Sequence, residues 1–116
     1  MASTTDLQED ISPERAAELH AAGEVQLVDV RELYEHEAGH VSGAEHIEFV
    51  QLSNRVDSIN RDRPVVFYCR SGGRSAIATQ AFRASGYDAR NMTGGLLAWA
   101  EKALPIEPDG GSVADH

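Results

Sequence analysis

The chain has one cysteine and one lysine among its 116 residues, and it contains no long run of apolar residues. With Cys69 as the only thiol, no disulfide can form within the chain. Its apolar stretches fall short of the roughly 18 residues that a transmembrane helix needs. The first ten residues, MASTTDLQED, lack the basic and apolar segments of a secretory signal. A cytoplasmic location is therefore the default expectation.

Positive charge is also scarce, because 10 basic residues stand against 19 acidic ones and the net charge is −9. A chain of this charge repels nucleic acid and anionic membranes, so neither is expected as a partner. The length suits one domain with one core, and 41% apolar and 25% charged residues are typical of a globular protein. A monomer is the default expectation for such a domain.

Short β-prone segments alternate with segments that favour helices. Strands are predicted over residues 7–11, 25–30, 45–50, 65–68 and 89–92, and helices over residues 13–22, 32–38, 52–59, 74–85 and 95–103. In the helix over 74–85, Ile77, Ala81 and Ala84 are expected to share the apolar face. The alternation predicts an α/β fold, a three-layer sandwich with a small, mainly parallel central sheet flanked by helices.

The domain is expected to span residues 7–107. Residues 1–6 are small and polar, and residues 108–116, PDGGSVADH, are rich in glycine and poor in large apolar groups. Both ends are predicted to be flexible.

The stretch VVFYCRSGGRSA, residues 65–76, places Cys69 between a predicted strand and a predicted helix. Gly72 and Gly73 allow a loop whose N–H groups turn inward, and the helix N-terminus points at the same place. Arg70 and Arg74 add positive charge. All three effects favour the thiolate, so the pKa of Cys69 is expected to lie below the roughly 8.5 of a free cysteine, which makes it a candidate nucleophile.

A simpler interpretation is that Cys69 is a small buried hydrophobic residue and that the two arginines are solvated surface. The neighbouring glycines and arginines, together with the position between strand and helix, favour a functional thiol.

Three motifs carry a resemblance to a known family. The loop CRSGGRS resembles the active-site loop of rhodanese-domain sulfurtransferases. The segment VDVRELYEHEAGHVSGAEHI resembles the first signature of that family, D-x-R-x-x-x-E followed by G-H-I/V-x-G-A. The segment NMTGGLLAWAEKALPIE resembles its closing segment. The motifs follow in order over about residues 7–107, so the resemblance covers nearly the whole chain.

The resemblance implies a sulfurtransferase. Cys69 would take a sulfane sulfur from a donor such as thiosulfate, hold it as a persulfide and pass it to cyanide or a thiol, in a ping-pong scheme that needs no metal or organic cofactor. A thioredoxin-like protein is one candidate acceptor. The anion-binding loop would consist of Arg70, Ser71, Gly72, Gly73, Arg74 and Ser75.

Loop length distinguishes this reaction from its relatives. Four residues separate Cys69 from Arg74, whereas the loop of tyrosine phosphatases and related cell-cycle phosphatases is one residue longer. In the family, the shorter loop goes with sulfur transfer and the longer one with phosphate or arsenate. A phosphatase or arsenate reductase is therefore an alternative that the loop disfavours. A rhodanese-fold binding or regulatory module without turnover is another, and the presence of Cys69 argues against it.

Other residues match the family motifs in supporting roles. Asp29 and Arg31 are expected to pair near the loop, and His40 is expected to be a hydrogen-bonded structural residue. Gly94 and Gly95 fit a close backbone approach at the last strand-to-helix turn.

Residues 36–46, HEAGHVSGAEH, also match a zinc-protease motif in which three histidines bind the metal and Glu37 is the general base. That motif needs His36 and His40 on one continuous helix, and Gly39 is expected to interrupt it. The zinc interpretation also leaves CRSGGRS unexplained, so it is rejected.

Overall fold

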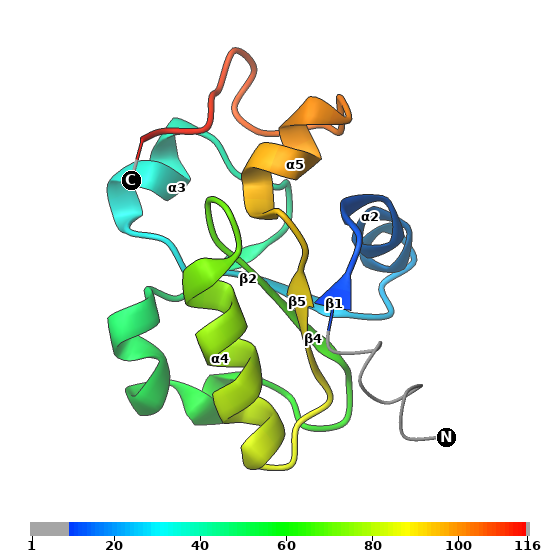
Figure 1. Cartoon of the computed structure of the whole chain (residues 1–116), viewed down its shortest axis with the longest axis vertical. Coiled ribbons are helices and arrows are strands. Elements are labelled where there is room, and N and C mark those ends of the chain that lie inside the picture. The colour runs from blue at the N-terminus through cyan, green and yellow to red at the C-terminus, as the bar shows by residue number, and fades with distance from the viewer. Residues whose placement is uncertain (1–9, 116) are drawn as a thin grey trace.

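The computed structural model describes residues 10–115, so the predicted flexible residues 1–6 and the first part of the predicted strand 7–11 lie outside the described residues. None of the described helices is long and apolar enough to cross a membrane. Figure 1 shows how the elements are arranged. The strands are β1 (Asp10–Ile11), β2 (Gln26–Asp29), β3 (Glu45–His46), β4 (Val65–Tyr68) and β5 (Ala89–Met92). The helices are α2 (Pro13–Ala21), α3 (Leu33–Ala38), α4 (Gly73–Ala84) and α5 (Gly95–Glu101), with 3₁₀ segments η1 (Phe49–Asn54) and η2 (Val56–Ser58).

Two helices begin at side-chain caps that the sequence supplies. Ser12 accepts a hydrogen bond from the Arg15 N–H at 3.1 Å, and Pro13 fills the first helical position of α2. In α3, Glu32 and Glu35 form a reciprocal capping box. These caps fix where the chain enters each helix.

The five strands form one parallel sheet in the order β1-β5-β4-β2-β3. The central strand, β4, is buried along its whole length, as its four apolar residues predict. Phe67 pairs with Val28 of β2 on one side and with Asn91 of β5 on the other. Because all strands are parallel, their carboxyl ends lie at one edge of the sheet.

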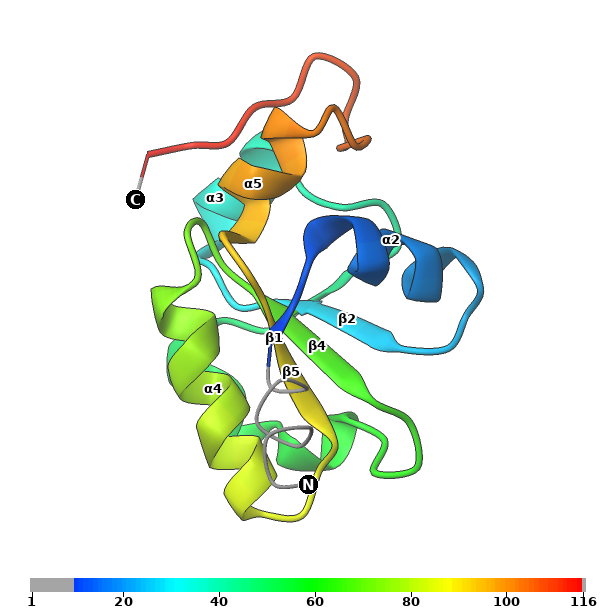
Figure 2. The same cartoon turned by 45° about the vertical axis from the view of Figure 1, so that its right-hand side comes forward.

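Helices cover both faces of the sheet. On one face, Phe67 of β4 packs with Phe82 of α4, and η1 and η2 complete that layer. On the other face, Tyr68 of β4 packs in a cluster with Leu96 and Trp99 of α5 and with Ala16 of α2. Figure 2 shows the sheet between these two layers. The predicted three-layer α/β fold with a parallel sheet is confirmed.

The strand predicted over 45–50 is wrong in its second half. Strand β3 ends at His46, although the N–H of Ile47 still donates to the carbonyl of Asp29 at 3.0 Å. At Glu48 the chain turns, and the N–H of Gln51 donates to the Glu48 carbonyl at 2.8 Å, which begins η1. The predicted helix over 52–59 is thus a pair of 3₁₀ segments that begins three residues earlier.

The apolar face predicted for α4 is also wrong. Ile77 is 60% exposed, and Ala81 and Ala84 are exposed too. The buried face of α4 consists of Ser75, Ala78, Thr79 and Phe82. This stripe is less apolar than the predicted one because Ser75 and Thr79 face inward and find hydrogen-bond partners there.

Residues 108–115 lie against α3 and the loop after β4 (Figure 1). The N–H of Ser112 donates to the Ala38 carbonyl at 2.9 Å, and the Tyr34 hydroxyl donates to the Asp115 carbonyl at 3.1 Å. Val113 packs against the core on the α2–α5 side. The sequence predicts that this segment is flexible. The contacts give it a defined place, and its mobility stays a prediction.

Candidate active site around Cys69

Cys69 follows the last residue of β4, at the carboxyl edge of the sheet. The chain then turns back into α4 through Gly72, whose φ of +115° lies in the region that favours glycine. This turn aims the Gly72 N–H at the sulfur, with 3.1 Å between the nitrogen and Sγ of Cys69. The residue is only 2% exposed, yet it lines a hollow of about 280 Å³ together with Arg70, Ser71, Gly73 and Arg74. The thiol is therefore buried but borders an opening.

The surroundings of Sγ lower the pKa of Cys69. Burial acts in the opposite direction and raises it, since an apolar environment disfavours the thiolate. Hydrogen bonds to the sulfur from the Ser75 hydroxyl and from the N–H groups of Ser75, Gly72 and Ser71 outweigh burial. The direction agrees with the expectation from the sequence, and its main cause is hydrogen bonding rather than the two arginines.

Ser75 stands between the sulfur and a buried amide. Its Oγ lies 3.4 Å from Sγ of Cys69 and 2.6 Å from Oδ1 of Asn91. A hydroxyl carries one proton, so it donates either to the amide oxygen or to the sulfur. A thiolate is the stronger acceptor and would draw that proton toward Sγ. When the proton instead lies toward Oδ1 of Asn91, at the carboxyl end of β5, that hydrogen bond holds Ser75 in place beside the sulfur.

Arg74 lies in the first turn of α4, but its charge is directed to α3. Its two terminal nitrogens donate to the two carboxylate oxygens of Glu35, at 3.0 and 3.1 Å. Glu35 is fully buried. The hydrogen bonds from Arg74 keep the pKa of Glu35 lowered although burial raises it. Arg74 therefore ties α3 to the start of α4 as well as bordering the opening at Cys69.

Arg70 points to the C-terminal segment. Its Nε donates to the Ala114 carbonyl at 3.2 Å, and its Nη2 lies 3.5 Å from a carboxylate oxygen of Asp115. The Asp115 side chain is fully exposed, so the ion pair is weak. Arg70 lines the same opening as Cys69 and keeps its charge near the mouth.

Asp29 and Arg31 form the buried pair that the sequence predicts. Nε and Nη2 of Arg31 donate to the Asp29 carboxylate at 2.9 and 2.7 Å, and Nη2 also donates to the Gly39 carbonyl. Both residues are fully buried. The guanidinium lies over the Tyr68 ring, with Cζ 5.7 Å from its centroid, and Nη1 has no hydrogen-bond partner among the described residues. The pair braces the end of β2, and its further hydrogen bonds run to Gly39 and His36.

His40 and two further histidines form a stack behind this pair. The ring centroids of His36 and His40 are 3.9 Å apart, and those of His36 and His46 are 4.4 Å apart. Each ring has one nitrogen in a hydrogen bond: His36 with Asp29, His40 with the His36 carbonyl, and His46 with the Arg31 carbonyl. His40 thus has the hydrogen bond that the sequence predicts, and its supporting role stays a prediction.

The stack includes the three histidines of the rejected zinc motif. Helix α3 ends at Ala38, as the sequence predicts from Gly39. Interplanar angles of 13° and 18° set the rings face to face, so their in-plane lone pairs do not converge on one point. Within residues 10–115, no cluster of three or more histidine, cysteine, aspartate or glutamate residues has a geometry that could hold a metal ion.

The start of α5 closes the site from the side of β5. The N–H groups of Leu96 and Leu97 donate to the carbonyls of Cys69 and Arg70, at 2.9 and 3.0 Å. A side chain on Gly95 would place its Cβ 2.5 Å from each of those carbonyl oxygens. The predicted close backbone approach is therefore present at Gly95, and it fixes the first part of the loop. A Cβ on Gly94 would instead meet the Ala98 side chain, at 2.6 Å.

The fold and the site define a class: a parallel α/β domain that presents one hydrogen-bonded cysteine at the turn from the central strand into a helix. The sequence model of the Rhodanese-like domain family matches residues 12–102. The chain belongs to this family, as its three motifs predict.

Relatives agree with this assignment. A sulfurtransferase from Allochromatium vinosum is 39% identical over 89 residues, which are 75% of this chain and 83% of that protein. The thiosulfate sulfurtransferase GlpE from Pseudomonas fluorescens is 31% identical over 103 residues, 88% of this chain and 93% of that protein. An HTH-type transcriptional regulator from Mycobacterium tuberculosis is 39% identical over 98 residues, 82% of this chain. The chain spans only 42% of that regulator.

Solved structures share the fold. A rhodanese-like domain protein from Staphylococcus aureus superposes with a TM-score of 0.76 at 29% identity, over 86% of this chain and 99% of that one. The family thus includes free-standing domains of this size as well as parts of longer proteins.

The structure adds Glu35 and Asn91 to the candidate site. Glu35 is the final residue of the D-x-R-x-x-x-E pattern, so its place in that motif was the available signal. Asn91 is a polar residue within a buried strand, which is a signal for a hydrogen-bonding role. Their contacts with Arg74 and Ser75 cross between elements that are distant in the sequence.

Proposed function

We propose that this chain is a sulfurtransferase that carries a sulfane sulfur as a persulfide on Cys69, with thiosulfate as a donor and cyanide or a thiol as the acceptor. The observation that carries the proposal is the set of hydrogen bonds from the loop to Sγ, at the turn between β4 and α4. The relatives named sulfurtransferase support the reaction class, and the relative named thiosulfate sulfurtransferase supports the donor.

In the first half-reaction, the Cys69 thiolate attacks the outer sulfur of thiosulfate. A bond forms between Sγ and that sulfur, the S–S bond of thiosulfate breaks, and sulfite leaves with the electron pair. The negative charge ends on the outer sulfur of the persulfide. The N-terminal N–H groups of α4 and the loop amides stabilise that charge.

In the second half-reaction, the acceptor takes the outer sulfur. The carbon of cyanide, or the sulfur of a thiolate, forms a bond to it. The bond between Sγ and the outer sulfur breaks, and its electron pair returns to Sγ as the thiolate. The Gly72 N–H and the Ser75 hydroxyl are placed to stabilise this leaving group.

The ion pair between Arg74 and Glu35 supports sulfur rather than phosphate as the transferred group. A phosphatase needs an arginine that binds the phosphoryl oxygens with both terminal nitrogens. Here Glu35 already accepts hydrogen bonds from both terminal nitrogens of Arg74. The anion would then be bound chiefly by backbone amides, which suits a small persulfide.

Intact mass after treatment with thiosulfate tests the proposal. The wild type should gain one sulfur atom, and cyanide should remove it with release of thiocyanate. Cys69→Ser should gain nothing. If the wild type also gains no sulfur from thiosulfate or from a polysulfide while iodoacetamide still modifies Cys69, the persulfide mechanism is refuted.

That negative result would favour a binding module. Two observations point to this second candidate: Cys69 is 2% exposed, and a similar segment is part of an HTH-type transcriptional regulator. A module of this kind would keep Cys69 for packing, so Cys69→Ala would lower its stability without removing any activity.

A further inference from the structure

A second hollow adjoins the opening at Cys69. It has a volume of about 330 Å³ and is lined by Val30, Glu32, Glu48, Phe49, Val50 and Arg74. Arg74 also lines the opening at Cys69, so the two hollows share a wall. A molecule that reaches Sγ from this side must pass over the second hollow.

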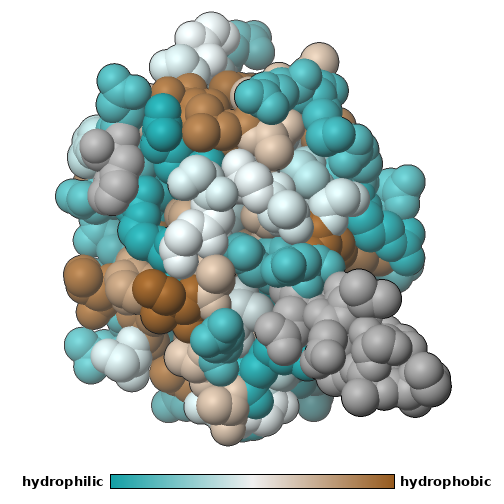
Figure 3. All heavy atoms as spheres, viewed as in Figure 1, coloured by the Kyte–Doolittle hydropathy of each residue, from teal (hydrophilic) through white to brown (hydrophobic). Residues whose placement is uncertain are grey.

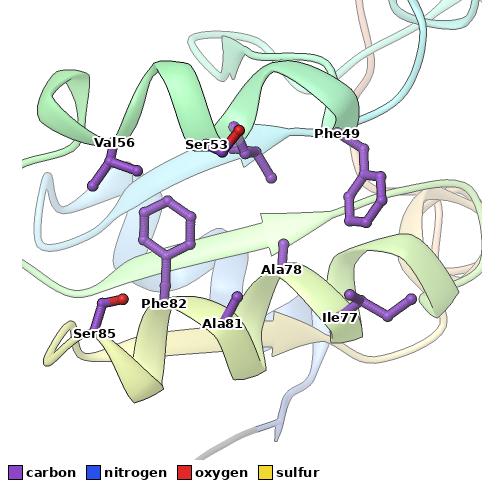
Figure 4. A pocket seen from close by; sticks show the side chains of 9 residues that line it. Phe49, Ser53, Val56, Ile77, Ala78, Ala81, Phe82 and Ser85 are labelled. Atoms are coloured by element: carbon purple, nitrogen blue, oxygen red, sulfur yellow. The ribbon is translucent and has the colours of Figure 1, made fainter.

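The surface around this hollow carries exposed apolar side chains. Val50 is 79% exposed and Ile77 is 60% exposed, and both are among the few large hydrophobic residues that the described surface exposes. Phe49 extends from the second hollow into a groove of about 320 Å³ between η1 and α4, where Ile77 lies opposite it (Figure 4). Figure 3 shows apolar atoms gathered over the start of α4 and the adjacent η1. An apolar strip thus leads away from the candidate active site.

Two carboxylates border the same strip. Glu32 accepts the N–H of Glu35 in the capping box, and Glu48 accepts the N–H of Leu33 at 2.9 Å, so both side chains are held in place. The only arginine among the residues lining the second hollow, Arg74, is neutralised by Glu35. We call Glu32, Glu48, Phe49 and Val50 the acidic rim. The negative charge of its two carboxylates is opposite in sign to the positive potential of the N–H groups that line the loop around Sγ.

The donor and the acceptor of the proposed reaction would therefore approach two different surfaces. The loop around Sγ attracts a small anionic donor, whereas the acidic rim repels anions and exposes apolar area. A small anionic thiol gains little there, because it cannot cover the strip and is repelled by the carboxylates. A protein with basic and apolar side chains around a cysteine would bury the strip and pair with Glu32 and Glu48.

We propose that the acidic rim is the docking surface for the sulfur acceptor, and that this acceptor is a protein that presents a cysteine thiol from a basic and apolar surface. The inference rests on the proposed function, because it names the acceptor of the same persulfide. The acceptor thiolate bonds to the outer sulfur, the bond from that sulfur to Sγ breaks, and Sγ leaves as the thiolate. The acceptor departs as a persulfide.

Discharge of the loaded protein onto two peptides tests this inference. Each short peptide has one cysteine between leucines, with lysines at the outer positions of one and glutamates at those of the other. The rim variant is Glu32→Gln with Glu48→Gln, because glutamine keeps an oxygen for the capping hydrogen bonds. The control variant is Glu24→Gln with Glu45→Gln, which removes the same charge from exposed positions outside the rim. Cyanide discharge is the reference for each protein.

In the wild type, the lysine peptide should discharge the persulfide faster than the glutamate peptide, and high salt should reduce the difference. Relative to cyanide, the rate with the lysine peptide should fall about threefold to tenfold in the rim variant, as the loss of two charge pairs of about 0.3–0.7 kcal/mol each predicts. The control variant should stay within about twofold of the wild type. Equal loss in both variants, or equal rates with both peptides, would overturn the inference while leaving the persulfide mechanism intact.

Binding separates this inference from the proposed function. The lysine peptide with serine in place of its cysteine is labelled, and its fluorescence anisotropy is measured with unloaded protein. If neither thiosulfate nor a polysulfide adds sulfur while iodoacetamide still modifies Cys69, but this peptide binds the wild type and not the rim variant, the sulfurtransferase proposal fails. The acidic rim would then bind a basic and apolar protein surface that does not accept sulfur. If the wild type dimerises in solution and the rim variant does not, the surface binds a second copy of the chain and the inference is wrong.

Discussion

Both carboxylate oxygens of Glu35 accept hydrogen bonds from the guanidinium of Arg74, at 3.0 and 3.1 Å. The pair joins the buried side of α3 to the first turn of α4, five residues after Cys69 in the sequence. Because Glu35 is fully buried, its charge depends on Arg74 for compensation. The pair therefore holds the loop in place, and it also prevents Arg74 from binding a substrate anion with both nitrogens.

Replacement of Glu35 by glutamine should destabilise the protein and make its stability less dependent on pH. Breaking a fully buried pair costs about 3–5 kcal/mol, and we expect about 2–3 kcal/mol here because Arg74 keeps some exposure. The pKa of Glu35 is lowered in the folded protein, so its contribution is present above pH 4.5 and is lost as the pH falls through the folded pKa. Urea unfolding at neutral pH and at about pH 4 measures both effects.

The control for this variant is Glu37→Gln, which changes an exposed glutamate in the same helix. It should alter the free energy of unfolding by less than about 0.5 kcal/mol. If Glu35→Gln were as stable as this control, the pair would have no structural role.

Replacement of Ser75 by alanine should raise the pKa of Cys69. The variant loses the hydroxyl that lies 3.4 Å from Sγ, and the amide donors remain. The rate of alkylation by iodoacetamide, measured against pH, should have its midpoint at a lower pH in the wild type than in the variant. At neutral pH, alkylation should slow about threefold to tenfold, the equivalent of one hydrogen bond of about 0.5–1.5 kcal/mol. Ser85→Ala, at the far end of α4, should leave the profile unchanged.

Replacement of Gly95 by alanine should displace the loop. The new Cβ would meet the Cys69 and Arg70 carbonyl oxygens at 2.5 Å, and the φ of +61° adds strain. Gly23 offers a matched control, because its φ of +72° is similar and nothing lies within 4 Å of its Cβ position. Gly23→Ala should cost about 1–2 kcal/mol of backbone strain. Gly95→Ala should cost about 1–3 kcal/mol more, from overpacking, and should also lose the sulfur adduct. If both substitutions lowered the free energy of unfolding equally, the loop would move away from the new Cβ without a further loss of stability.

The sequence is sufficient to predict the parts of the site that are close in the chain. The apolar run before Cys69 predicts β4, and the glycines after it predict the turn into α4. Both predictions depend on neighbouring residues, whose preferences act directly on the backbone. Family motifs extend the prediction to the pairing of Asp29 with Arg31 and to the close backbone approach at Gly95, both of which are present in the structure.

The preferences of neighbouring residues do not predict contacts between residues that are distant in the sequence. Glu35 and Arg74 are 39 residues apart, Arg70 and Ala114 are 44 apart, and Ser75 and Asn91 are 16 apart. Such contacts follow from the strand order, which puts the ends of β2, β4 and β5 at one edge. The buried face of α4 differs from the predicted one for a related reason. Ser75 and Thr79 find partners in the structure, so a polar stripe can face inward.

Replacement of His36 by glutamine should reduce the loss of stability in mild acid. Burial lowers the pKa of His36, and the nearby His40 and His46 lower it further, although the hydrogen bond to Asp29 acts in the opposite direction. A histidine whose folded pKa lies below 6.5 takes up its proton more readily in the unfolded chain. The wild type should therefore lose stability as the pH falls from about 7.5 to about 5.5.

His20→Gln is the matched control, because His20 also bonds to a backbone carbonyl but lies outside the histidine stack. The measurement is the free energy of unfolding in urea at both pH values, for the wild type and the two variants. His36→Gln should flatten the pH dependence, since glutamine does not titrate, and it should do so by more than His20→Gln does. If His36→Gln kept the full slope, the acid sensitivity would come from other groups. We do not expect this outcome. The His36 and His40 rings lie face to face with centroids 3.9 Å apart, so a proton on His36 should lower the stability of the folded protein.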